Sequence, residues 1–377
     1  MITSTAELYS ALKDEATTLN SMSSQDTVFL TGFPGFIASR LLRRLAPDSD
    51  RFLLLVQPAF TERAANELIT IAKEAGKSPS DFVLLAGDIT EPNLGLSSAD
   101  LEIARTSSTI VFHLAAVYDL AVARDLAFRV NVTGTRNVNE FVRSLANLRH
   151  YHYVSTCYVA GKRTGRILET ELKHEAGFRN YYEETKHLAE LDVDAIKSEL
   201  PVTIHRPAVV CGDSHSGQTA KYDGIYYLIF YLLKWPAVLS TLNIGNSEVA
   251  LNLVPVDFVV EAMSAVARDP LATGKTIQLA DPEPLSTREL FNSISRCLAG
   301  RESMLTVPAP LVHTSLMLPL APKITGLPHS AVPYFFLKQT YDTSEAEVLL
   351  NPHGVSCPPF ESYVETIVGY AASHPRP

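Results

Sequence analysis

The sequence predicts a doubly wound α/β fold, in which helices cover both faces of a parallel sheet, followed by a smaller, mainly helical C-terminal cap. Short β-rich apolar runs alternate with helical patterns up to residue 212 of the 377 residues, and this alternation is typical of βαβ units. Several runs are apolar throughout, as expected of strands covered on both faces. Beyond residue 212 the alternation breaks down, which indicates a second, differently built part.

Six runs in the first part have the composition of strands. They are residues 27–32, 52–56, 82–89, 109–116, 150–161 and 202–212. Helical patterns separate them, in the segments GFIASRLLRRLA, ERAANELITIAKEAG, NVTGTRNVNEFVRSLA and YYEETKHLAELDVDAIKSEL.

The second part begins with an aromatic-rich segment, and a strand–turn–helix pattern follows at residues 251–267. A further strand is expected at 276–281 and a helix at 286–300, where Ser286 and Glu289 have the spacing of a capping box. The Pro- and Leu-rich remainder shows no clear period. We therefore expect an N-terminal extension with one helix (1–25), a doubly wound domain (26–212 with about 251–281) and a cap (213–250 with 282–377).

Composition and charge exclude several classes of protein. The net charge is −9 and no cluster of Lys and Arg stands out, which argues against a nucleic-acid partner. The four cysteines are scattered and are expected to be reduced thiols of a cytoplasmic protein. The N-terminus is too polar for a signal peptide. The most hydrophobic segment, 224–240, is interrupted by Lys234 and Pro236, so we expect no membrane span and at most a peripheral lipid contact.

The string TGFPGFIA joins the first predicted strand to the first helix. Glycines at this place let a pyrophosphate approach the backbone, and the start of the helix offers it free N–H groups. A tight turn without a ligand is the alternative explanation of two glycines alone. The full string resembles the Thr-Gly-x-x-Gly-Phe-Ile-Gly signature of the extended short-chain dehydrogenase/reductases, with Ala38 in place of the last glycine. The resemblance implies a Rossmann domain that binds NAD(P).

The end of the second strand bears on the choice of cofactor. A fold that prefers NAD usually places Asp or Glu there for the ribose 2′-hydroxyl. This chain has Gln57 instead, with Arg63 shortly after as a candidate partner of a 2′-phosphate, although Arg63 could equally be a solvated helix charge. We therefore expect NADPH, with NADH as the alternative.

The pattern Tyr-x-x-x-Lys, which places both side chains on one face of a helix, occurs at Tyr9/Lys13, Tyr182/Lys186 and Tyr334/Lys338. A neighbouring ammonium group is expected to lower the pKa of the phenol. Only the second pair opens a helix that follows a strand ending in hydroxyl residues, YVST. Tyr182/Lys186 is therefore the candidate pair, and Tyr181 lacks a lysine four residues on.

YVST followed by YYEETK resembles the Ser/Thr–Tyr–Lys triad of the same family. Aligning Gly161 with the family's glycine implies that Thr156, rather than Ser155, contacts the substrate oxygen. Tyr182 would then donate the proton, and Lys186 would hold the nicotinamide ribose. Cys157 is expected in a strand, pointing away from the site as a packed thiol.

The resemblance extends to further positions around the cofactor: Asp88 near the adenine, small residues of HLAA along the cofactor, and NVTGT bracing the strands. His113 and His205 are expected to be packed residues, and no cluster has the spacing of a metal site. The full set expected against the cofactor is Thr31, Gly32, Phe33, Pro34, Gly35, Phe36, Ile37, Gln57, Arg63, Asp88, Ile89, Ala115, Ala116, Asn131, Lys186, Pro207 and Val209.

The segment from HRPAVVCGDS to KYDGIYYLIFYLLKW, with NLVPVDFVVEA, resembles the thioester-reductase and fatty-acyl reductase (male-sterility) branch over about residues 26–267. That resemblance implies NADPH-dependent reduction of an acyl thioester, on CoA or a carrier protein, to an aldehyde. The aromatic residues would contact the acyl chain and Lys221 a pantetheine phosphate, although both could simply be cap packing and a solvated charge. The candidate substrate residues are Tyr118, Lys221, Tyr226, Tyr227 and Tyr231.

Other functions remain open at this point. The same triad would serve a dehydrogenase that acts on a lipid or steroid-like ketone, alcohol or aldehyde. A nucleotide-sugar epimerase would use it too, but the hydrophobic 224–240 segment argues against a sugar substrate. A non-catalytic cofactor sensor would not require a proton donor beside the nicotinamide. The sequence leaves the oligomeric state undecided.

Overall fold

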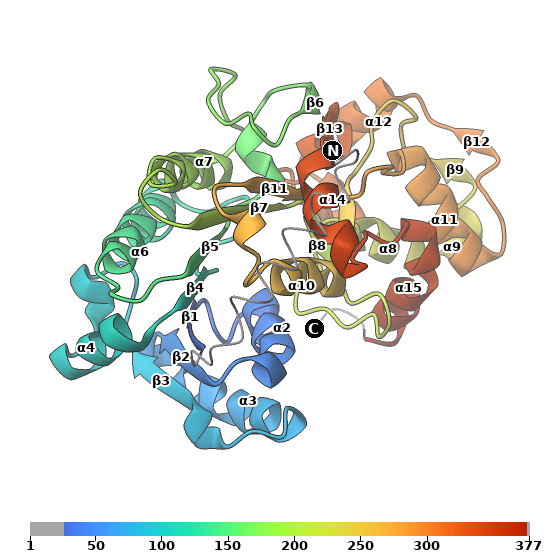
Figure 1. Ribbon diagram of the computed structural model, residues 1–377. Coiled ribbons are helices and arrows are strands. Elements are labelled where there is room, and N and C mark those ends of the chain that lie inside the picture. Colours follow the sequence, from blue (N-terminus) through green and yellow to red (C-terminus); the bar gives the residue numbers. More distant parts are fainter. Residues whose placement is uncertain (1–25, 375–377) are drawn as a thin grey trace, which may run out of the picture.

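The computed structural model describes residues 26–374, so the expected N-terminal helix lies outside the described residues. Within them, a seven-stranded parallel sheet forms the centre of the larger part of the molecule (Figure 1). From one edge to the other its strands are β11 (Thr276–Leu279), β7 (Val202–Pro207), β5 (His150–Val154), β4 (Ile110–His113), β1 (Thr27–Thr31), β2 (Arg51–Val56) and β3 (Phe82–Ala86). The predicted doubly wound fold is confirmed.

Helices cover both faces of this sheet (Figure 1). One face packs on α2 (Phe36–Leu45), α3 (Thr61–Glu74) and α10 (Val256–Ala265), and the other on α4 (Ser98–Ser107), α6 (Gly134–Arg143) and α7 (Tyr181–Asp194). Successive side chains of a strand point to opposite faces, so Val28 and Leu30 join the first core and Phe29 the second. All three side chains are buried, which explains why the strand is apolar throughout.

Most predicted strands end earlier than expected, and two of them are followed by a different structure. The run 150–161 is a strand only to Val154, and a 3₁₀ turn occupies Cys157–Ala160. The run 202–212 divides at Ala208 into β7 and β8 (Val209–Cys211), and β8 pairs with β10 (Leu253–Pro255) outside the main sheet. Pro207 lacks an N–H group, which suits the end of a strand.

The smaller part of the molecule is mainly helical. Its core lies between α8 (Tyr226–Leu233), α11 (Thr287–Ala299) and α15 (Val364–Ser373), where Ile229, Phe291 and Ile367 are fully buried. The predicted capping box of α11 is present, since Ser286 and Glu289 bond each other's backbone N–H groups. The helix α14 (Ser344–Leu350) instead packs on the sheet beside β11, through Ala346, Leu349 and Leu350.

The remaining helices and strands are short. They are α5 (Arg124–Ala127), β6 (Gly165–Ile167), which pairs with β13 (Gln339–Tyr341), β9 (Leu242–Asn243), which pairs with β12 (Leu305–Thr306), α9 (Pro236–Leu239), α12 (Ala309–Leu316) and α13 (Ala321–Thr325). Among residues 26–374, no helix combines the length and apolar character that crossing a bilayer requires.

Candidate active site

A cleft of about 690 Å³ lies at the carboxyl ends of the central strands. In open parallel sheets this is where the connections diverge and ligands bind. Most residues expected at the site line this cleft: Thr31, Gly32, Phe33, Pro34, Gly35, Phe36, Ile37, Gln57, Arg63, Asp88, Ile89, Ala115, Ala116, Tyr118, Thr156, Tyr182, Lys186, Pro207, Val209 and Lys221. The fold thus brings together segments spread over nearly two hundred residues of the chain.

The turn between β1 and α2 has the geometry of a phosphate cradle. Gly32 has a φ of +93°, and a Cβ added there would lie 2.8 Å from the backbone nitrogen of Ala115. A Cβ on Gly35 would lie 2.6 Å from the carbonyl oxygen of Gly32, so neither position accepts a side chain without rearrangement. Within the described residues no side chain caps α2, whose first N–H groups therefore remain for a ligand. These residues fit a dinucleotide pyrophosphate.

Gln57, Asp88 and Arg63 line the same cleft as the glycine turn. The Gln57 side-chain amide donates to the Asp88 carboxylate at 2.8 Å. The Arg63 guanidinium donates to the carbonyl oxygen of Pro34 at 2.8 Å, while its side chain remains exposed. A positive group is therefore held beside the glycine turn, and β2 ends without a carboxylate.

The helix α7 presents Tyr182, Lys186 and Glu190 on one face, because they are four residues apart. Its start is held by Asn180, whose side-chain oxygen accepts from the Glu183 N–H at 3.0 Å. Tyr334 of the tail donates to the buried Glu183 carboxylate at 2.5 Å. Tyr334 thus anchors α7, whereas Lys338 pairs with Glu248 on the surface at 2.6 Å. The third Tyr/Lys pair is therefore structural, and Tyr9/Lys13 lies outside the described residues.

Lys186 is almost fully buried and its ammonium nitrogen has two acceptors. Nζ lies 2.8 Å from the Tyr153 hydroxyl and 2.8 Å from the Val154 carbonyl oxygen, and it sits over the Tyr153 ring. Burial lowers the pKa of Lys186 to about 7, and the Glu190 carboxylate acts in the opposite direction. The lysine can therefore change charge near neutral pH.

A buried polar chain continues from Tyr153 to the glycine turn. Tyr153 bonds Thr135, whose hydroxyl lies 3.2 Å from His113 Nε2. His113 Nδ1 lies 2.8 Å from the Thr31 hydroxyl, which also accepts from the Ala115 N–H. Each ring nitrogen of His113 thus shares a hydrogen bond with a threonine hydroxyl. Burial lowers the pKa of His113 to about 3, which keeps this link neutral.

Tyr182 is buried beside Thr156 in the cleft. Burial raises its pKa above the ordinary value, and a hydrogen bond with the Thr156 side chain partly opposes this rise. The expected lowering by Lys186 was wrong for this structure, because the loss of hydration outweighs other effects on the phenol. Tyr182 is consequently a neutral phenol at pH 7, able to give up a proton. Tyr181 next to it is exposed and does not line the cleft.

Ser155 and Thr156 have different partners, although both reach the cleft. The Ser155 hydroxyl donates to the buried Glu190 carboxylate, which also pairs with Arg206 at 2.6 Å. Thr156 instead accepts from the Tyr158 N–H at 3.2 Å and bonds Tyr182. The geometry therefore favours Thr156 as the hydroxyl beside the phenol.

Cys157 does not lie in a strand, although the sequence predicts one there. It begins a 3₁₀ turn rather than continuing the strand, and its thiol donates to the Arg206 carbonyl oxygen at 3.1 Å. Burial raises the pKa of this thiol. Its role as a packed thiol stands, but the reason is the turn that follows Thr156, not strand alternation.

Tyr118 and Lys221 lie at the mouth of the cleft. The Tyr118 ring contacts Tyr182 edge-on at 5.1 Å between centroids, and Lys221 Nζ donates to the Tyr118 carbonyl oxygen at 3.1 Å. Lys221 also pairs with Asp223 at 3.6 Å. Asp223 and the buried Tyr158 line the cleft but were missed in the sequence. Asp223 follows Lys221 in the string KYDG, which could have indicated it.

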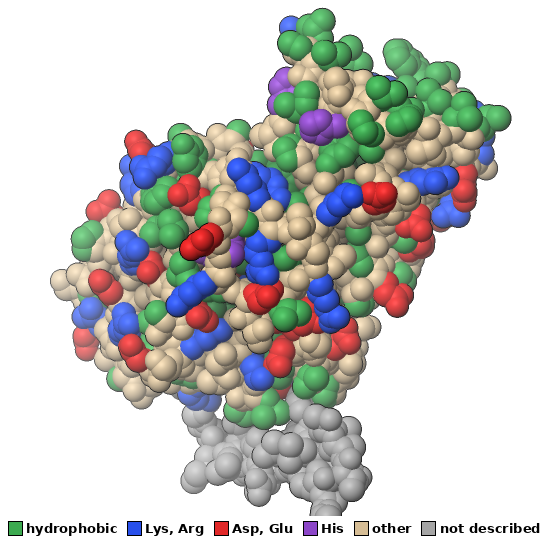
Figure 2. Space-filling view, turned by 90° about the horizontal axis from the view of Figure 1, so that it is seen from above, with side chains coloured by type: hydrophobic (Ala, Val, Ile, Leu, Met, Phe, Trp, Pro, Cys, Tyr) green, Lys and Arg blue, Asp and Glu red, His purple; other side chains and the backbone are tan. Residues whose placement is uncertain are grey.

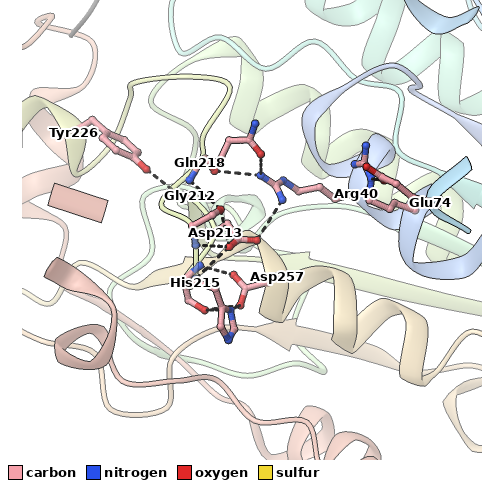
Figure 3. A network of polar contacts seen from close by, with 11 residues as sticks. Arg40, Glu74, Gly212, Asp213, His215, Gln218, Tyr226 and Asp257 are labelled. Atoms are coloured by element: carbon pink, nitrogen blue, oxygen red, sulfur yellow. Dashed lines mark hydrogen bonds and ion pairs between the residues drawn. The ribbon is translucent and has the colours of Figure 1, made fainter. Parts of the chain in front are cut away.

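Four expected contacts lie elsewhere. Asn131 is buried behind the cleft, where its amide donates to the Val117 carbonyl oxygen at 3.3 Å and to the Thr185 hydroxyl at 3.0 Å. It positions the site rather than lining it. Tyr226 does not line the cleft either, because it is buried and its hydroxyl accepts from the Gly212 N–H at 3.0 Å (Figure 3). Tyr227 and Tyr231 line a separate, narrow crevice inside the cap.

The loop after β8 ties the cap to the main sheet (Figure 3). Arg40 on α2 pairs with Asp213 at 3.2 Å and donates to Gln218 at 3.0 Å. The fold also brings Asp257 close to Asp213 and His215, a grouping that sequence spacing did not reveal. Asp213 accepts from Arg40 and Ser216, and Asp257 accepts from Ser214, so protein donors already occupy both carboxylates.

Residues 30–263 match the family described as male sterility protein. Among curated proteins, the chain is 25% identical to fatty acyl-CoA reductase wat of Drosophila melanogaster, over 70% of this chain and 58% of the relative. It is 24% identical to the chloroplastic fatty acyl-CoA reductase 2 of Arabidopsis thaliana, over 68% of this chain and 52% of the relative. The chain thus spans about half the length of these relatives.

Solved structures share the fold. The terminal R domain of the myxalamid PKS-NRPS pathway superposes with a TM-score of 0.76 at 23% identity, covering 93% of this chain and 92% of that one. UDP-glucuronic acid 4-epimerase from Bacillus cereus gives 0.64 at 18% identity, covering 92% and 99%. Together with the family match, these confirm the predicted family and fold, and with them an oxidoreductase-type domain that binds a nicotinamide cofactor.

Proposed function

The chain belongs to the male sterility protein family, and on this premise we propose that it reduces a lipid-like acyl thioester, carried by CoA or a carrier protein, to the aldehyde, with NADPH as reductant. The observation that carries the proposal is the grouping of Thr156, Tyr182 and Lys186 in the cleft that the glycine turn opens. Fatty acyl-CoA reductases among the relatives support the thioester.

Each part of the chemistry has a residue to perform it. A reduced nicotinamide cofactor held by residues 31–37 and Lys186 would supply the hydride that the thioester carbonyl carbon accepts. Thr156 would hold the carbonyl oxygen by a hydrogen bond, and Tyr182 would donate its proton to that oxygen. The resulting hemithioacetal then loses its C–S bond, which releases the thiol and the aldehyde. A neutral, buried phenol suits this donation.

Lys186 would stabilise the phenolate that remains after proton transfer. A cation four residues from Tyr182 on the same helix face favours the charged phenol over the neutral one. The pKa of about 7 means that an appreciable fraction of Lys186 is charged at neutral pH. The proton that Tyr182 loses must be restored from solvent at the mouth of the cleft, where Tyr118 and Lys221 lie.

The apolar interior of the cap supports a lipid-like substrate. Tyr227 and Tyr231 line the cap crevice with Phe291, Phe335 and other apolar side chains. An acyl chain that entered this crevice would meet apolar surface rather than water.

The experiment compares NADPH oxidation with a long-chain acyl-CoA, the same acyl group on a carrier protein, and matched ketones and aldehydes. Consumption with either thioester, together with the aldehyde as product, is the expected result. Consumption with ketones alone would favour the alternative dehydrogenase of lipid-like ketones. Turnover at the same rate with Tyr182→Phe would remove the triad from the reaction.

A further inference from the structure

The outer side of the cap carries large hydrophobic side chains in exposed positions. Trp235 and Val238 of the α9 region are each 68% exposed, and Ile324 of α13 is 67% exposed. Leu311 on α12 and Leu318 and Leu320 between α12 and α13 are exposed as well. Scattered exposed apolar residues are normal, but a contiguous group of them marks an interaction site. We call this group the outer cap surface.

Two distant segments are joined in this surface. Lys234 at the end of α8 donates to the carbonyl oxygen of Ile324, and β9 pairs with β12. The Arg301 guanidinium donates to the carbonyl oxygen of Ala237 at 2.7 Å. Figure 2 shows hydrophobic and histidine side chains gathered on a protruding end of the molecule. The surface is therefore convex and held by its own hydrogen bonds.

The two segments that build the outer cap surface, residues 224–247 and 303–341, contain basic residues but no acidic ones. Lys234 and Lys323 are exposed within them, and Arg301 and Glu302 are exposed at their border. Apolar side chains flanked by basic groups, including an exposed tryptophan, are the combination that favours the headgroup region of an anionic bilayer.

The helices beneath this surface are apolar on their inner side too. Val312 and Leu316 of α12, with Leu327, line the cap crevice together with Tyr227 and Phe291. The exposed side of α12 carries Leu311 together with the polar His313, Thr314 and Ser315, so the exposed apolar residues concentrate at and after the end of this helix. Only a few residues separate this part of the outer cap surface from the apolar crevice.

From these observations we propose that the outer cap surface binds peripherally to an anionic lipid bilayer, with the side chains around Leu318, Leu320 and Ile324 inserted among the headgroups. No element would cross the membrane. The proposal does not depend on the substrate or on the triad, because it concerns a face of the cap distinct from the residues lining the cleft.

The test is sedimentation of the full chain with vesicles of phosphatidylcholine and phosphatidylserine, and with vesicles of phosphatidylcholine alone. We expect binding to the mixed vesicles that weakens on neutral vesicles and at high salt. The variant Leu318→Ser/Leu320→Ser/Ile324→Ser should bind at least about tenfold more weakly. The control Ile69→Ser/Val348→Ser removes exposed apolar residues elsewhere and should bind like the wild type. Unchanged circular dichroism and cofactor binding would confirm that both variants fold.

Three results would overturn the proposal. The first is a wild type that stays in the supernatant with both kinds of vesicle. The second is equal loss of binding in the control variant. The third is a wild type that self-associates in light scattering while the triple variant is monomeric, since a second copy of the chain would then cover the surface.

Discussion

Lys186 Nζ lies 2.8 Å from the hydroxyl oxygen of Tyr153, a buried residue on the strand beside it. Burial removes water from around the ammonium group, and one phenol oxygen and one carbonyl oxygen accept its hydrogen bonds instead. Tyr153 is also the start of the polar chain through Thr135 and His113 to the glycine turn. A continuous series of buried hydrogen bonds thus joins the lysine to the loop that opens the cleft.

Tyr153→Phe should lower the pKa of Lys186 below about 7, because the charged amine loses an acceptor. A hydrogen bond to a charged group contributes about 1.5–3 kcal/mol, or about one to two pKa units. We expect the basic limb of kcat/KM to move to lower pH by about that amount, with thioester reduction slowed at neutral pH. The measurement is the pH profile of turnover.

Tyr151→Phe is the matched control for this change. Tyr151 is buried on the same strand, but its hydroxyl donates to Asn139 at 3.0 Å. It should leave the pH profile in place. A shift of equal size in both variants would mean that loss of any buried hydroxyl on β5, rather than contact with Lys186, moves the profile.

Tyr182→Phe should reduce turnover by at least about a hundredfold, since general acid catalysis contributes about 10²–10⁴-fold. Cofactor affinity should change little, because the glycine turn and Lys186 remain. Rapid-mixing turnover and fluorescence titration with NADPH measure the two effects separately. Tyr181→Phe, one residue away at an exposed position, should behave like the wild type.

Arg63→Ala should weaken NADPH binding by about tenfold or more and leave NADH binding nearly unchanged, because only the former carries a phosphate for the guanidinium. The side chain lines the cleft and donates to the carbonyl oxygen of Pro34 in the glycine turn. Isothermal titration with both cofactors measures the difference. Arg43→Ala, which removes an arginine of α2 that pairs with Glu74 of α3, is the control. Equal losses for NADPH and NADH would contradict the assignment.

Acid should destabilise the fold through buried histidines. Burial lowers the pKa of His113 and His205 to about 3 and that of His150 to about 4, and it holds the pKa of His152 well below its usual value. Between pH 6.5 and those values the unfolded chain binds protons that the folded chain does not, so stability is present above pH 6.5 and falls as the pH drops. Each ring accounts for about 2 kcal/mol between pH 7 and pH 5.

His152→Gln isolates one of these rings. His152 Nε2 lies 3.1 Å from the Ala267 carbonyl oxygen and Nδ1 lies 3.0 Å from His205 Nε2, so the ring is held neutral between a carbonyl and a second imidazole. Urea unfolding at pH 7 and pH 5 should show a difference about 2 kcal/mol smaller in the variant. The exposed His215→Gln should retain the wild-type difference, and the same difference in all three proteins would count against the assignment.

Much of the fold could be predicted because its elements are determined locally. The alternation of apolar runs and helical patterns predicted the strands of the sheet, and TGFPGFIA predicted the turn at its centre. Strand ends were less accurate, because Val154 and Pro207 end their strands where the chain turns toward the cleft. The division into domains stays a prediction.

By itself the sequence determined which side chains could serve the chemistry: two glycines at a strand–helix junction, and a tyrosine and a lysine one helical turn apart. Only the tertiary structure decided what surrounds them. It placed the Tyr153 hydroxyl against Lys186 and hydrogen-bonded Ser155 to Glu190. It also buried Tyr226 and placed Asn131 behind the cleft. The physical reason is that spacing along the chain specifies a shared helix face, whereas burial, hydration and hydrogen-bond partners depend on segments far apart in sequence.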